Sequence, residues 1–141
     1  MKTRFDSLVK IKKDDVQVKE RNVQSAFVSV TNATDAVTKA TNDLNSIEMP
    51  RVGTMGQMLQ TNTILGAQRA VLVEKRNWLS FATSQLNEAR EHLKQSQIEL
   101  EKYNYLKNQE IQKELQRIKK QESKDLDEIA LISFMRHKEG A

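Results

Sequence analysis

The residues with the strongest potential for chemistry in this sequence are a histidine–glutamate pair and a small acidic group. His92 follows Glu88 by four residues, a spacing that places two potential metal ligands on one helix face. The acidic group, Asp125, Asp127 and Glu128, lacks the spacing and the glycine of a calcium loop. Neither group supplies enough ligands for a site, so we expect no metal.

Catalytic motifs are also missing from the sequence. It contains no cysteine, which excludes thiol catalysis, disulfides and cysteine-bound metal. It has no glycine-rich phosphate loop and no nucleophile elbow. We therefore expect a protein that is not an enzyme, with no catalytic residue and no cofactor.

The composition is typical of long helices rather than of a globular core. Of 141 residues, 30% are charged and 5% are aromatic, and there are one proline and four glycines. The formal net charge of +4 is modest and basic residues are interspersed with acidic ones, so we expect no nucleic-acid binding. No apolar run is long enough to cross a bilayer, and the first residues lack a signal core. These features favour a cytoplasmic coiled coil without membrane insertion.

The second half of the chain carries a long heptad row. A straight α-helix drifts by about 20° per heptad against a seven-residue repeat, so a sustained row requires supercoiling around a partner. The row consists of large apolar residues at every seventh position: Met58, Leu65, Leu72, Leu79, Leu86, Leu93 and Leu100.

The first half of the chain supplies the partner. Its own row is Val9, Val16, Val23, Val30, Val37 and Leu44, and three residues after each position lies a second row of lysine, alanine and isoleucine. An antiparallel pairing centred between Val52 and Gly53 places Ala33 opposite Leu72, Val9 opposite Ser96 and Phe5 opposite Leu100. Large residues then meet small ones, which lets two helices approach closely.

These rows predict an all-α fold in which two long helices form an antiparallel coiled-coil hairpin. We expect a single domain over residues 1–141, with helix one at 4–48, the turn at 49–56 and helix two at 57–136. Helix two extends beyond the first after about residue 100. Thr3 with Asp6, and Thr54 with Gln57, are the predicted N-terminal caps.

Three further features are candidates for protein contacts. Met49, Met55 and Met58 cluster at the turn, where methionine serves either as an adaptable contact or as a gap filler. Trp78 lies level with Phe27, and we interpret the pair as packing between the helices, with a partner site as the alternative. The apolar residues of 126–135 have no partner helix, which is typical of an interface.

The two ends of the chain resemble the FliJ family, the small coiled-coil component of the flagellar type III export apparatus. The opening Lys2-Thr3-Arg4-Phe5-Asp6-Ser7-Leu8-Val9-Lys10-Ile11-Lys12-Lys13 is similar to the start of that family. The segment Asp127-Glu128-Ile129-Ala130 through Phe134-Met135-Arg136 is similar to its C-terminus. Length and the two-helix layout agree with the resemblance.

The resemblance implies a non-enzymatic stalk and escort protein on the cytoplasmic face of the inner membrane. Its implied partners are the flagellar export ATPase hexamer, the membrane export gate protein and export chaperones. The implied ATPase contact lies at the end that carries both termini, on Arg4, Phe5, Leu8, Phe134 and Arg136. The resemblance implies that the body or the tip of the hairpin contacts the export gate, without assigning that contact to particular residues. The alternative is a structural or adaptor coiled coil that homo-oligomerises through its C-terminal tail and has no ATPase partner.

Overall fold

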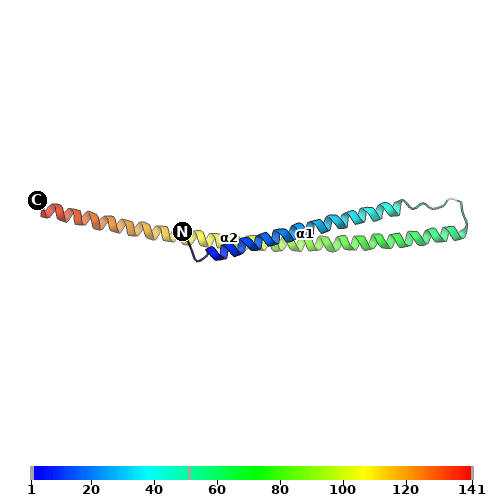
Figure 1. Ribbon diagram of the computed structural model, residues 1–141, viewed down its shortest axis with the longest axis horizontal. Coiled ribbons are helices and arrows are strands. Elements are labelled where there is room, and N and C mark those ends of the chain that lie inside the picture. The colour runs from blue at the N-terminus through cyan, green and yellow to red at the C-terminus, as the bar shows by residue number, and fades with distance from the viewer. Residues whose placement is uncertain (1, 51, 141) are drawn as a thin grey trace. The chain divides into compact units, whose positions relative to one another are not determined.

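The computed structural model describes residues 2–50 and 52–140. Within these ranges the chain forms two helices and no strand: α1, Asp6–Asn45, and α2, Met55–Glu139 (Figure 1). The helices pack against each other and α2 is much longer than α1. The predicted fold class is therefore confirmed. No described helix contains a stretch apolar enough to span a membrane.

The chain divides into two units, each containing part of both helices. We call them the base unit, Met1–Asp14 with Ile98–Ala141, and the hairpin unit, Asp15–Gln97. The helix-to-helix turn lies within the hairpin unit, and the start of α1 lies within the base unit. The prediction of a single domain stays a prediction.

The core of the hairpin unit is a narrow seam of small and medium side chains. Ala33 is completely buried, and the other buried residues of this unit are Val16, Ala40, Leu72, Ala82, Leu86 and Ser96. Each lies on a row of residues spaced by seven, and Ala82 and Ser96 lie on a second row of α2 that also contains Ala89. The remaining leucines and valines of the rows are half-buried, except Met58, which is 40% exposed beside the turn. Burying a leucine contributes about 1.5–3 kcal/mol, so this seam holds the unit together with few large side chains.

The register of the helices differs from the predicted one by about one heptad. The prediction places Ser96 opposite Val9, whereas in the hairpin unit the Ser96 hydroxyl donates a 2.8 Å hydrogen bond to Asp15 Oδ2. In the base unit the first turn of α1 lies beside Lys107 and Glu110 rather than Leu100. A seven-residue pattern is unchanged by a shift of seven, so the apolar rows alone could not select the register. The part of α2 without a partner accordingly begins beyond Glu110, later than predicted.

Both predicted caps form. The Thr54 hydroxyl accepts from the Gln57 N–H, and the Gln57 side chain accepts from the Thr54 N–H, each at 3.2 Å. This reciprocal pair satisfies two backbone donors that the start of α2 would otherwise leave open. At the start of α1 the Thr3 hydroxyl accepts from the Phe5 N–H, and the Asp6 side chain accepts from the Thr3 N–H.

The second half of α1 is helical because of its packing. Four threonine hydroxyls donate to the carbonyl four residues earlier, a bond that weakens and bends helices slightly. The residues that make these bonds are Thr31, Thr34, Thr38 and Thr41. The helix ends at Asn45, a few residues before the predicted end, whereas α2 continues to Glu139, and the positive charges of Arg136 and Lys138 suit its C-terminus.

Candidate protein-binding surfaces

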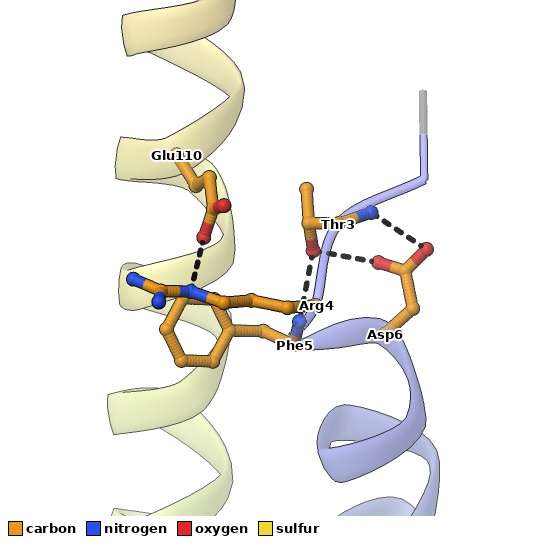
Figure 2. Close-up of polar contacts among 5 residues, drawn as sticks. All are labelled: Thr3, Arg4, Phe5, Asp6 and Glu110. Atoms are coloured by element: carbon orange, nitrogen blue, oxygen red, sulfur yellow. Dashed lines mark hydrogen bonds and ion pairs between the residues drawn. The ribbon is translucent and has the colours of Figure 1, made fainter.

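The first turn of α1 is held in place by a network around Thr3 (Figure 2). The Thr3 N–H donates to Asp6 Oδ2 at 3.2 Å, and the Thr3 hydroxyl donates to Asp6 Oδ1 at 3.0 Å and accepts from the Phe5 N–H at 3.2 Å. The hydrogen bond from Thr3 lowers the pKa of the Asp6 carboxyl, and Lys107, 3.3 Å away, lowers it further. The network fixes where the next two side chains point.

Arg4 and Phe5 form one surface on this capped turn. Arg4 Nε donates to Glu110 Oε2 at 3.1 Å, and the Arg4 guanidinium carbon lies 5.0 Å from the centre of the Phe5 ring (Figure 2). Phe5 is half-buried and lines a shallow groove with Leu106 and Gln109 of α2. Leu8, one turn later, is exposed. The base therefore presents a cation and an aromatic edge whose positions are restrained by α2.

Charged pairs join the two helices within the base unit. Besides Arg4–Glu110 and Asp6–Lys107, Lys12 Nζ lies 2.6 Å from Glu99 Oε2 and 5.9 Å from the centre of the Tyr103 ring. In the described residues of the hairpin unit, no ion pair joins α1 to α2. The charges that connect the helices are thus concentrated at the base.

The part of α2 that follows the base begins with a bidentate pair. Arg117 donates to both carboxylate oxygens of Glu114, at 2.7 and 3.1 Å. The hydrogen bond from Arg117 lowers the pKa of Glu114, and the same bond raises the pKa of Arg117. Both side chains also line the groove beside Phe5, so the groove edge is charged.

The rest of α2 is the tail, residues 119–140, and every residue in it is exposed. Phe134 is 66% exposed, and the other large apolar side chains of the tail are Leu126, Ile129, Leu131, Ile132 and Met135. Arg136 is exposed at its end. Glu110 and Phe134 lie on one continuous helix, which separates them by about 36 Å at 1.5 Å per residue. The structure therefore brings Arg4 and Phe5 together, but places Phe134 and Arg136 far from them.

The turn presents a second apolar surface. Met49, Met55 and Met58 are all exposed, and so are Val52 and Leu59 beside them. Only Met58 belongs to a heptad row, and it lies where the seam ends. These methionines are available for contact rather than filling a gap.

Three exposed aromatic residues of the hairpin unit were only partly foreseen. Phe27 is 54% exposed and Trp78 is 41% exposed, so the prediction that this pair packs between the helices is wrong. Phe81, one turn after Trp78, is 64% exposed and was missed. The sequence did indicate this exposure, because none of the three aromatic residues lies on a heptad row, where the buried positions of the seam are expected. Lys75 Nζ lies 5.8 Å from the centre of the Trp78 ring.

The residues considered for chemistry do not form a site. His92 Nε2 lies 3.6 Å from Glu88 Oε1, a helical pair with both side chains exposed. Within residues 2–50 and 52–140, no group of three or more acidic, histidine or cysteine side chains could hold a metal ion.

Comparison with known proteins identifies a family. A family model described as "Flagellar FliJ protein" matches residues 1–139, nearly the whole chain. Curated proteins and solved structures give no match.

Proposed function

The chain belongs to the FliJ family and is a component of the flagellar export apparatus; from this premise, we propose that it is a stalk that binds the export ATPase hexamer. The contact would use Arg4, Phe5 and Leu8 of the base together with Phe134 and Arg136 of the tail. The observation that carries this proposal is the tail itself, an exposed helix with six large apolar side chains that meets no partner helix among the described residues. Apolar surface of this extent on one element usually marks an interface.

The arrangement of these residues suits a hexamer with a central opening. A single helix is about 10–12 Å wide with its side chains, so the tail can enter a channel that the two-helix base cannot. The roughly 36 Å between Glu110 and Phe134 then separates a contact inside the channel from one at its rim. Arg4 and Phe5, restrained by Glu110 and the Thr3 cap, are suited to the rim. Stimulation of ATP hydrolysis would require the stalk to bind the conformational states of the ATPase subunits with unequal affinity. A ligand with equal affinity for all states leaves their populations unchanged.

The hairpin unit would provide the contacts to the other export components. Its exposed surfaces are the turn methionines and the aromatic side chains of Phe27, Trp78 and Phe81. Aromatic anchors supply much of the binding energy of protein interfaces. We propose that these surfaces contact the membrane export gate protein and export chaperones, with the protein acting non-enzymatically at the cytoplasmic face of the inner membrane.

The test is ATP hydrolysis by the flagellar export ATPase, titrated with this protein. Wild-type protein should stimulate hydrolysis saturably, and Phe134→Ala should raise the concentration needed for half stimulation at least about tenfold, as expected for an interface anchor. Phe81→Ala is the matched control, because Phe81 is an equally exposed phenylalanine on the same helix. It should leave stimulation unchanged.

The same titration separates the proposal from its alternative. The exposed tail would also suit homo-oligomerisation, which sedimentation of the protein alone measures directly. A dimer that Phe134→Ala dissociates, with no stimulation of the assembled ATPase at any ratio, would replace the stalk by an adaptor coiled coil.

A further inference from the structure

The apolar seam is compatible with more than one register. The valine row of α1 always meets the row of α2 that contains Ala82, Ala89 and Ser96, whichever heptad is aligned. The leucine row of α2 likewise always meets the row of α1 that contains alanine and lysine. A slide of α1 by seven residues, about 10 Å along the axis, therefore exchanges equivalent layers. Something other than these layers must select the register.

The charges of the base unit distinguish the registers. We name the three pairs Arg4–Glu110, Asp6–Lys107 and Lys12–Glu99 the base latch. If α1 moved one heptad toward the turn, the residues seven positions earlier on α2 would replace these partners. Those residues are Tyr103, Leu100 and His92. None of the three attractive pairs would be kept.

A slide in the opposite direction is worse. The residues seven positions later on α2 would bring Arg117 to Arg4 and Glu114 to Asp6, so that like charges face each other. Lys12 would meet Leu106 instead of Glu99. Charges flanking a coiled-coil seam set partner choice and alignment in this way, even where each pair adds little stability.

The hairpin unit contains an independent sign of the same register. Its buried Ser96 hydroxyl donates to Asp15, and a one-heptad slide toward the turn would place Ala89 there instead. The linker of residues 46–54 does not oppose such a slide. The slide moves the end of α1 closer to the level at which α2 begins, so the nine linker residues have a shorter distance to span along the axis.

We propose that the base latch is a register selector: it holds α1 in one of two heptad alignments that the seam accepts, and opening it lets α1 slide one heptad toward the turn. The slide would move the first turn of α1 away from Glu110 and lengthen the partner-free part of α2. It would also bring the exposed Met58 level with Ile47 at the turn. The hairpin would thus have two discrete states, as packed helices that shift by whole layers do.

The test uses disulfide formation in the chain, which contains no cysteine. Val23→Cys with Ala89→Cys reports the observed register, and Val23→Cys with Ala82→Cys reports the register after the slide. The two pairs share one position and differ only in which buried or half-buried alanine is replaced. In the otherwise wild-type chain the first pair should form an intramolecular disulfide and the second should not.

The latch is then opened by Glu99→Lys with Glu110→Lys, and restored by adding Lys12→Glu with Arg4→Glu. Opening should change the ratio of the two disulfides by about tenfold or more toward the second pair, and restoration should return it. Unchanged dominance of the first pair would overturn the proposal. Loss of both disulfides together with helicity would also overturn it, because the latch would then be needed for pairing rather than for register.

Discussion

The base unit and the hairpin unit join the same two helices by different means. The hairpin unit buries alanine, valine and leucine in small–large layers, whereas the base unit adds three ion pairs between α1 and α2. Burial of apolar surface is strong but does not depend on which equivalent residue lies opposite. Exposed ion pairs are weak, about 0–1 kcal/mol each, but each needs one particular partner. The strength with which the two helices are held together and the register in which they align therefore have different physical causes in this protein.

The largest expected effect concerns the apolar packing that holds the two helices together in the hairpin unit. Leu86→Ala removes a buried leucine from the seam and should lower the free energy of unfolding by about 2–4 kcal/mol. Urea unfolding followed by circular dichroism measures it. Leu126→Ala is the control, since that leucine is exposed in the tail and its loss should change stability by less than about 0.5 kcal/mol. Equal losses would mean that the tail is packed against something in the isolated protein.

A smaller effect tests whether loss of a helix cap in one unit leaves the helix end in the other unit unchanged. Thr3→Ala removes the cap of α1 in the base unit and should cost about 1 kcal/mol of helix stability. Thr54→Ala should cost a similar amount at the start of α2 in the hairpin unit. Amide hydrogen exchange should speed up near Phe5 in the first variant and near Gln57 in the second. Faster exchange at both places in either variant would contradict the separation of the units.

Local signals in the sequence were sufficient for the fold and the helix starts. The heptad rows predicted two antiparallel helices because burial repeats every seven residues, and Thr3 and Thr54 predicted caps because capping involves only the next three residues. The end of α1 at Asn45 was less predictable, since threonine and asparagine are poor helix formers and the helix persists only while it is packed.

The register and the surfaces depended on information that a repeat does not contain. A shift of seven residues moves Ser96 from the layer of Val9 to the layer of Val16, next to Asp15, and leaves the kind of residue in each apolar layer unchanged. Only a charge-by-charge comparison of alignments could therefore have found it. The separation of Arg4 from Phe134 follows from the unbroken course of α2 alone, and the shift of register shortens it. Phe81 was missed because the prediction considered mainly residues at heptad positions, and Phe81 lies outside them.

The smallest expected effect concerns the pKa of one carboxyl group in the base unit, that of Asp6. Hydrogen bonds from Thr3, and then Lys107, hold the pKa of Asp6 below its ordinary value. A carboxyl whose pKa is lowered by folding stabilises the folded state at pH values above its unfolded pKa, about 3.9. This contribution is lost as the pH falls through the lower folded value. In Thr3→Ala the pKa of Asp6 should rise toward its ordinary value, as measured by NMR titration of the carboxyl carbon, while Ser7→Ala should leave it unchanged. A pKa that is unaffected by Thr3→Ala but rises in Lys107→Ala would mean that the ion pair, and not the cap, controls Asp6, and that alignment charges reach into the cap itself.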